Sequence, residues 1–276
     1  MLIKSKKEIK QLKESGKLMG EVLESVAAQC RPGISTLELD AEAERLIIKA
    51  GGRPAFKGYR TAVADFPFPA TLCTSLNSEI VHGIPRKSVI LKDGDLVSLD
   101  IGMEWPSNDK KARKQESKKA RGVFTDTAVT LAIGKVGDKA IQLMAVTKQA
   151  LEEGIKAAQP GNSVAAIGRA VENYVRLQGK YGIVRDLVGH GVGHAVHEEP
   201  YIPNYYDPAL ESIKLVPGMV IAIEPMISLG SWKVHTMPDG WTIKMSDNST
   251  CAHFEHTVVI TEKGNVVVTR RPSERE

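Results

Sequence analysis

Cysteines, long apolar runs and net charge are all scarce in this sequence, and each shortage excludes a class of protein. Three cysteines, Cys30, Cys73 and Cys251, form no CxxC or CxxH pair, which excludes a cysteine-based zinc finger. So few thiols favour a reducing compartment over a disulfide scaffold, and we expect a cytoplasmic protein. No segment approaches 18 apolar residues, and lysines interrupt the start of the chain, so neither a membrane span nor a secretory signal is predicted. The net charge of +4 does not by itself indicate nucleic-acid binding.

The length and composition are those of an ordinary globular protein. The 276 residues are 42% apolar and 25% charged, which argues against overall disorder. A chain of this length buries enough surface to hold a core without disulfides or a partner subunit. We therefore expect a single domain spanning residues 1–276 and a monomer.

Hydrophobic spacing and chain-breaking residues predict several helices and strands. Apolar residues three and four apart predict a first helix, which the Arg31-Pro32-Gly33 turn ends. A capping box at Ser35 and Glu38 predicts a second helix. Two more helices are expected after Asp138 and after a cap at Ser163. Short apolar, β-branched runs predict buried strands at residues 95–101, 123–133, 216–224 and 255–261.

Residues 107–122 differ in composition from the rest of the chain. They include seven Lys or Arg and two acidic residues, a local net charge of +5. Their apolar side chains are no larger than Ala, so they cannot contribute to a core. We expect a solvent-exposed basic insertion within about residues 104–122.

Four short motifs recur in the same order in the two halves of the chain. The pairs are separated by offsets of 115 to about 130 residues. An internal duplication of this kind predicts two α+β pseudo-repeats, about residues 1–134 and 135–276, related by a pseudo-twofold axis within one domain. The paired segments are residues 31–35 with 159–163, 81–85 with 196–200, 94–100 with 218–224, and 124–129 with 254–259.

The duplication also pairs carboxylates within apolar strands. Asp100 and Glu224 are each expected to end a strand, whereas Asp126 and Glu255 open or interrupt one. Taken singly, each acid is more simply explained by an ion pair or an exposed strand end. Four buried carboxylates near one axis would repel, however, and divalent cations are the natural compensation. His190 lies in a glycine-rich segment and has no histidine counterpart in the first half, which favours Mn, Fe(II), Co or Zn.

Seven motifs together resemble the type I methionine aminopeptidases of the M24 metallopeptidase family. The resemblance runs from the first helix to about Thr269. It implies the pita-bread (creatinase-like) fold, an α+β architecture with two pseudo-twofold-related halves around a central antiparallel sheet. The motifs are NSEIVHGIP, DGDLVSLDIG, FTDTAV, GHGVGHAVHEEP, AIEPM, DGWTIK and FEHTVVIT.

The resemblance also implies a dinuclear metal site. Its five ligands map to Asp100, Asp126, His190, Glu224 and Glu255, with Asp126 and Glu255 bridging two divalent ions (Co, Mn, Fe(II) or Zn). His190 and Glu224 would complete one metal, and Asp100 the other.

Further positions carry the family's substrate contacts. His82 and His197 match two substrate-facing histidines, although each alone is more simply a structural histidine. The methionine pocket is expected from three side chains, Phe68, Cys73 and Trp241. Three residues depart from the family pattern: Asp65 and Val196 stand where aromatic side chains are usual, and His194 stands where a larger basic side chain is frequent. Taken alone, His194 and His253 are more simply structural histidines.

The implied reaction is metal-dependent removal of the N-terminal (initiator) methionine from nascent proteins and peptides whose second residue is small. Water activated by the dinuclear centre would attack the first peptide bond. Glu224 is expected to act as general base, with His197 bonding the developing oxyanion and His82 the scissile amide nitrogen.

Two other functions remain as alternatives. A proline-specific aminopeptidase or prolidase shares the five ligands but usually carries a separate N-terminal domain, for which no room precedes Asp100. A non-catalytic pita-bread protein that binds peptides or RNA typically lacks ligands, and this chain keeps all five. The 27 residues from His197 to Glu224 also leave no room for the insertion of type II enzymes, and the chain begins at the first core helix, so a compact bacterial-style type I enzyme is expected.

The expected partners are the N-termini of nascent polypeptides, and no membrane partner is expected. Residues 107–122 admit two interpretations, a solvated loop without a role or a contact with ribosomal RNA near the peptide exit.

Overall fold

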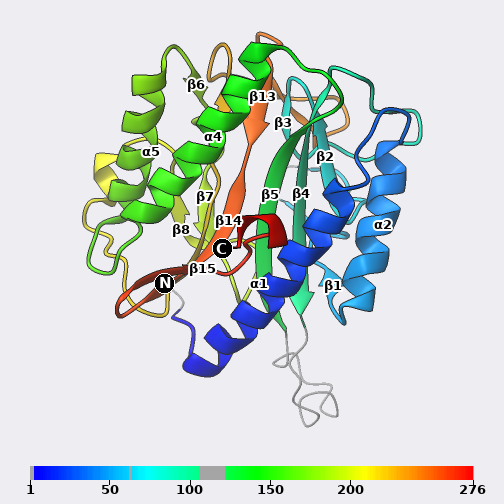
Figure 1. Cartoon of the computed structure of the whole chain (residues 1–276). Coiled ribbons are helices and arrows are strands. Elements are labelled where there is room, and N and C mark those ends of the chain that lie inside the picture. Colours follow the sequence, from blue (N-terminus) through cyan, green and yellow to red (C-terminus); the bar gives the residue numbers. More distant parts are fainter. Residues whose placement is uncertain (1–2, 62–63, 106–121, 276) are drawn as a thin grey trace.

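The computed structural model describes residues 3–61, 64–105 and 122–275, and Figure 1 shows their arrangement. Its main sheet has nine strands, and all the pairings between them are antiparallel. The basic insertion predicted at residues 107–122 lies, apart from Gly122, outside the described residues. Among the residues described, no helix combines the length and the apolarity needed to cross a membrane.

The main sheet runs in the order β1-β4-β5-β14-β9-β7-β8, with β2 also paired to β4 and β15 to β14. Two small sheets, β13-β10-β6 and β11-β12-β3, adjoin it. The strands of the main sheet are β1 (Arg53–Pro54), β2 (Leu72–Leu76), β4 (Leu96–Trp105), β5 (Val123–Ala132), β7 (Gly189–Gly191), β8 (Glu198–Ile202), β9 (Val220–Ile223), β14 (Glu255–Thr261) and β15 (Gly264–Val267). The small sheets comprise β3 (Glu79–Val81), β6 (Gly182–Ile183), β10 (Met226–Ser228), β11 (Val234–Thr236), β12 (Ile243–Met245) and β13 (Cys251–His253).

Within the described ranges, four α-helices accompany the main sheet: α1 (Lys6–Ala27), α2 (Thr36–Lys49), α4 (Asp138–Ala157) and α5 (Val164–Gln178). In Figure 1, α1 and α4 cross the front of the sheet, and α2 and α5 lie outside them. Two short 3-10 turns, η1 (Pro208–Leu210) and η2 (Pro272–Glu274), complete the structure.

The helix boundaries follow local capping chemistry. The capping box predicted at Ser35 and Glu38 is confirmed, and Ser5 with Glu8 forms a second one at the start of α1. Ser163 stands at the N-cap of α5, but the expected cap hydrogen bond is absent. Its hydroxyl instead donates to Glu211 Oε2 at 2.7 Å. A hydrogen bond to an ionised carboxylate is stronger than one between neutral groups.

The predicted strands are present, with two differences that affect the candidate site. The strand carrying Asp100 does not end there but continues to Trp105, because β5 pairs with it along the whole length to Val123. The strand before Glu224 is shorter than expected, since Gly218 turns the chain with a φ of +94° before β9 begins at Val220. Glu255 opens β14 as predicted.

Equivalent turns in the two halves make equivalent backbone bonds. The Gly33 N–H donates to the Leu91 carbonyl at 2.9 Å, and the Gly161 N–H donates to the Leu215 carbonyl at 2.8 Å. Both glycines have positive φ, +93° and +88°, which a side chain would disfavour. These matching turns are the structural counterpart of the motif repeat at residues 31–35 and 159–163.

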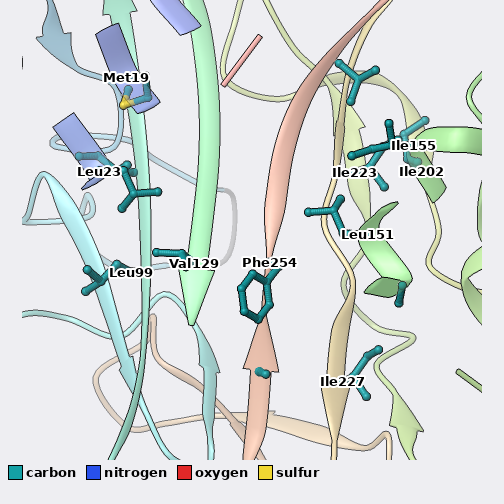
Figure 2. Packing of buried hydrophobic residues seen from close by; sticks show 14 of the residues in the cluster. Met19, Leu23, Leu99, Val129, Leu151, Ile155, Ile202, Ile223, Ile227 and Phe254 are labelled. Atoms are coloured by element: carbon teal, nitrogen blue, oxygen red, sulfur yellow. The ribbon is translucent and has the colours of Figure 1, made fainter. Parts of the chain in front are cut away.

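The apolar core fills the space between the main sheet and the helices. In Figure 2, Met19 and Leu23 of α1 lie near Leu99 and Val129 of the first-half strands. Leu151 and Ile155 of α4 pack near Ile223 in the second half. Since side chains alternate along a strand, the residues between these core positions point to the other face of the sheet. That other face carries the polar residues of the candidate site.

Candidate functional site

Three carboxylates, two from the first half and Glu255 from the second, lie on one face of the sheet because of the strand register. Asp100 on β4 is opposite Ala128 on β5, and Ala128 is opposite Glu255 at the start of β14. Asp126 precedes Ala128 by two positions and is opposite Gly102. The residues opposite Asp100 and Asp126 take up little room, because Ala128 has only a methyl group and Gly102 has no side chain. Three neighbouring strands therefore place three carboxyl groups over one patch of the sheet.

The second half adds one more carboxylate and an imidazole. Glu224 follows β9, whose last residue, Ile223, pairs with His256, the neighbour of Glu255. His190 on β7 pairs with Ala222 of β9, so it shares a face with Glu224. The His190 Nε2 atom lies 3.5 Å from Glu224 Oε1 and 3.9 Å from Asp126 Oδ2.

Potential metal-ligand atoms from these residues lie within 4.8 Å of one another in overlapping groups. One group contains Asp100, Asp126 and Glu255, and a second contains His190, Glu224 and Glu255. Asp126 also forms a group with His190 and His197. Asp126, Glu255 and His190 each belong to two groups, and of these three only the carboxylates of Asp126 and Glu255 have the two oxygens that a bridging ligand needs.

The tautomer of His190 suits metal ligation. Its Nδ1–H donates to the Gly191 carbonyl at 2.9 Å, which leaves the Nε2 lone pair directed toward the carboxylates. Burial lowers the pKa of His190 to about 3, so the ring is neutral at pH 7 and able to bind a cation.

The carboxylates are buried without enough positive charge to balance them. Asp100, Asp126, Glu224 and Glu255 are only 2–9% exposed. Burial raises the pKa of Asp100 to about 7 and that of Glu224 to about 8. Burial, followed by repulsion from the neighbouring carboxylates, raises the pKa values of Asp126 and Glu255 well above their usual range.

Several oxygens of this cluster also lack hydrogen bonds. Among the residues described, no partner reaches Asp100 Oδ1, Asp126 Oδ1 or Glu255 Oε1. Buried carboxylate oxygens are normally paired or bound to a metal. The donor set therefore fits divalent cations, which would supply both the missing charge and the missing contacts.

A cavity of about 230 Å³ opens beside the carboxylates. All ten residues that the sequence analysis assigned to the site line it, so the structure brings the whole predicted set together. They are Phe68, Cys73, His82, Asp100, Asp126, His190, His197, Glu224, Trp241 and Glu255.

The wall of the cavity away from the carboxylates is apolar. Phe68 and Trp241 meet edge to face with ring centroids 5.3 Å apart, and Cys73 and Val196 pack into the same cluster. Phe56 also belongs to it, although the sequence analysis did not identify this residue. The Phe56 ring lies over β4, where a Cβ at Gly102 would come within 2.6 Å of it. Of the residues described, Asp65 is not among those that line the cavity.

His197 stands at the mouth of the cavity, held by a residue that the sequence did not reveal. The Tyr59 hydroxyl lies 2.7 Å from His197 Nδ1, and the two rings are 5.0 Å apart. Burial raises the pKa of Tyr59, so its hydroxyl keeps its proton and can donate to Nδ1. In the neutral ring, His197 Nδ1 is then the acceptor and Nε2 carries the single N–H proton. His82 occupies a strained position, with a φ of +59° just after β3.

The loop between His190 and His197 is supported from outside by the N-terminal segment. The Lys4 ammonium lies 2.6 Å from Glu198 Oε2, and the two side chains are 1% and 4% exposed. Glu198 Oε1 accepts hydrogen bonds from the backbone N–H groups of His194 and Ala195. The His194 ring itself turns away to Glu8, 2.7 Å from Oε1, in agreement with its expected structural role.

Comparison with known proteins gives consistent matches. The model of metallopeptidase family M24 matches residues 10–262. The chain is 40% identical over 270 residues to methionine aminopeptidase 1 of Bacillus subtilis (strain 168), covering 98% of this chain and 99% of that protein. The crystal structure of methionine aminopeptidase from Thermotoga maritima superposes with a TM-score of 0.87 at 35% identity, covering 98% of this chain and 100% of that one.

A more distant structure shares the fold alone. The prolidase from Pyrococcus horikoshii OT3 has a TM-score of 0.71 at 23% identity, and the match covers 98% of this chain but only 63% of the prolidase. The expected mixed α/β fold around a curled antiparallel sheet is confirmed by both structures.

Proposed function

The chain belongs to metallopeptidase family M24, and we infer that it is a methionine aminopeptidase, which removes the N-terminal methionine from polypeptides. It has the pita-bread fold of that family. The observation that carries the function is the meeting of five buried metal-ligand side chains and an apolar pocket in one cavity. A prolidase-like function is not favoured, because relatives named methionine aminopeptidase match over nearly their whole length. A non-catalytic role is not favoured either, because all five proposed ligand side chains line one cavity.

We propose that Asp100, Asp126, His190, Glu224 and Glu255 hold two divalent ions, with Asp126 and Glu255 bridging. The overlapping ligand groups and the unpaired carboxylate oxygens support this assignment. When bound, such ions lower the pKa of water and polarise the peptide carbonyl. A donor set of four carboxylates and one imidazole suits Mn, Fe(II), Co or Zn.

We propose the following roles for the residues around the ions. Glu224 takes the proton of the attacking water and delivers it to the leaving amine. His197 donates its Nε2–H to the carbonyl oxygen as negative charge develops there, since Tyr59 occupies Nδ1. His82 bonds the scissile amide nitrogen.

The pocket accounts for the choice of substrate in this proposal. Phe68, Cys73 and Trp241 enclose the methionine side chain of the substrate. The residue that follows methionine must be small because it packs at the mouth of the cavity, near His197.

The first test is hydrolysis of a short peptide. The protein purified and loaded with Mn²⁺ or Co²⁺ should release methionine from Met-Ala-Ser and leave Met-Trp-Ser largely intact, with the free amino acid measured over time. An Xaa-Pro dipeptide serves as the control substrate. Cleavage of that dipeptide in place of Met-Ala-Ser would assign the chain to the prolidase-like group instead.

We propose further that residues 107–122 contact ribosomal RNA, a hypothesis that rests on their net charge of +5. Replacing them with a short glycine-containing turn should weaken ribosome binding and flatten its salt dependence, by a log–log slope of about 0.7–0.9 for each lost phosphate contact. Hydrolysis of Met-Ala-Ser should not change. Equal ribosome affinity of both forms at low salt would support the solvated-loop interpretation. The cytoplasmic location and the monomeric state remain predictions from the sequence.

A further inference from the structure

A histidine outside the five ligands lies buried beside them without a hydrogen bond to its ring. His253, the last residue of β13, is 1% exposed. Among the residues described, neither Nδ1 nor Nε2 of its imidazole has a hydrogen-bond partner. A neutral imidazole has one donor and one acceptor, and buried polar groups are almost always paired. From the sequence alone, His253 is expected to be a structural histidine near the proposed ligands.

The strand pairing brings His253 to Glu224. Residue Met226 of β10 is opposite His253 of β13, and Glu224 precedes Met226 by two residues. The His253 Nε2 atom lies 3.4 Å from Glu224 Oε2, while His190 Nε2 lies 3.5 Å from Glu224 Oε1. The Glu224 carboxylate is thus flanked by an imidazole on each oxygen.

The backbone of His253 is fixed by the other half of the molecule. Its N–H donates to Thr130 Oγ1 at 2.8 Å, and the same hydroxyl donates to the His253 carbonyl at 2.8 Å. Thr130 on β5 is opposite Ser98 on β4, whose hydroxyl lies 2.8 Å from that of Thr130. With its backbone clamped in this way, the imidazole retains little freedom except rotation of the ring. Such a clamp is unnecessary for a side chain that only fills space.

We propose that His253 is a positioning residue for Glu224. Its Nε2–H donates to Glu224 Oε2 and holds the carboxylate so that Oε1 faces His190 and the ligand cluster. A small ring rotation shortens the 3.4 Å separation to an ordinary hydrogen bond. His253 belongs to none of the ligand groups found among the described residues, so it acts through Glu224. The inference rests on the role proposed for Glu224 above.

Three substitutions at this one position separate the hydrogen bond from packing. The amide nitrogen of Gln reaches about as far from the backbone as Nε2 does, whereas that of Asn reaches only as far as Nδ1. His253→Leu and His253→Asn should therefore lower kcat for Met-Ala-Ser by about 10–100-fold, with KM changed by about 2-fold or less. His253→Gln should restore kcat to within about 3-fold of the parent protein.

Metal binding provides a readout that does not depend on turnover. Calorimetric titration of the metal-free proteins with Mn²⁺ should show weaker binding by about 10-fold in His253→Leu and His253→Asn, and parental binding in His253→Gln. If the parent released no methionine from Met-Ala-Ser, the proposed function would fail, yet this Mn²⁺ series would still decide the role of His253.

A second buried histidine supplies the matched control. His256 lies three residues along, is 2% exposed, and places Nδ1 3.1 Å from Thr269 Oγ1 and Nε2 3.5 Å from Glu274, away from the cavity. His256→Leu should lower the melting temperature but leave kcat and Mn²⁺ affinity unchanged. The proposal is overturned if His256→Leu impairs kcat as much as His253→Leu does. It is equally overturned if the Gln, Asn and Leu variants at position 253 behave alike.

Discussion

Replacing Asp126 with Asn should lower kcat/KM for Met-Ala-Ser by at least about 10³-fold and reduce the bound metal to less than two ions per chain. Asn keeps the volume of the side chain but removes its charge. The effect is large because Asp126 belongs to two of the ligand groups. Glu255→Gln should behave in the same way for the same reason. The measurements are metal content by elemental analysis and the rate of methionine release.

Substitutions of two other aspartates serve as comparisons for the Asp126→Asn variant. Asp100 belongs to only one ligand group, so Asp100→Asn should mainly weaken one of the two ions. Asp40 on α2 is also a buried carboxylate, 8% exposed, but it accepts the N–H groups of Thr71 and Leu72 and lies outside the cavity. Asp40→Asn should leave metal content and turnover unchanged. Two tightly bound ions and near-normal turnover in Asp126→Asn would contradict the dinuclear assignment.

Removing the metal should make the protein less stable as the pH rises from about 6.5 to 8. The folded-state pKa values of Asp100, about 7, and Glu224, about 8, lie above the ordinary values of 3.8 and 4.5. The folded metal-free chain therefore keeps protons that the unfolded chain has released, so its free energy of unfolding falls with pH across this interval. Burial also raises the pKa values of Asp126 and Glu255 well above their usual range, so these two groups add to the loss. We expect a total change of several kcal/mol.

The buried histidines make an opposite contribution to the pH dependence of the free energy of unfolding, and this contribution fades between pH 6.5 and 8. Burial lowers the pKa of His190 to about 3 and that of His82 to about 4, so these residues stabilise the fold as the pH rises toward 6.5. Because histidine in the unfolded chain titrates near pH 6.5, this opposing slope is about half lost at pH 6.5 and has nearly disappeared by pH 8. Urea unfolding at pH 6.5, 7, 7.5 and 8, with and without Mn²⁺, measures the effect. The slope should vanish in the Mn²⁺-loaded protein and be shallower in metal-free Asp126→Asn. Stability that rises over this interval without metal would show that the carboxylates are already ionised in the folded chain.

The carboxylate cluster could be predicted because the motif repeat between the two halves pairs acids that lie within apolar strands. Asp100 and Asp126 interrupt runs of apolar, β-branched residues, and a buried charge in such a run requires compensation. The extent of the strands was harder to predict, because it depends on the partner. Nothing within residues 95–101 indicates that β4 continues to Trp105, since that extension depends on pairing with β5.

The supporting residues could not be predicted for a related reason. Tyr59 is an ordinary tyrosine until the fold brings its hydroxyl to His197, 138 residues away. His253 stands two residues before a predicted ligand, but its place beside Glu224 depends on the pairing of β10 with β13. Phe56 enters the pocket only because Gly102 on another strand leaves room for its ring. In each case the role is created by a tertiary contact for which the local sequence carries no signal.

The buried pair of Lys4 and Glu198 has a consequence for the order in which the chain folds during synthesis. Lys4 is translated long before Glu198, yet its ammonium is desolvated against the carboxylate of that residue, 194 positions later, and its N–H donates to the carbonyl of Gly218. Until Glu198 has emerged, burying Lys4 would cost several kcal/mol, so the N-terminal segment must stay in solvent while most of the chain is translated. Contacts of such long sequence separation also slow folding. The loop that carries His197 therefore acquires the support of Lys4 only after the segment that contains Glu198 has been translated and has met the N-terminal segment.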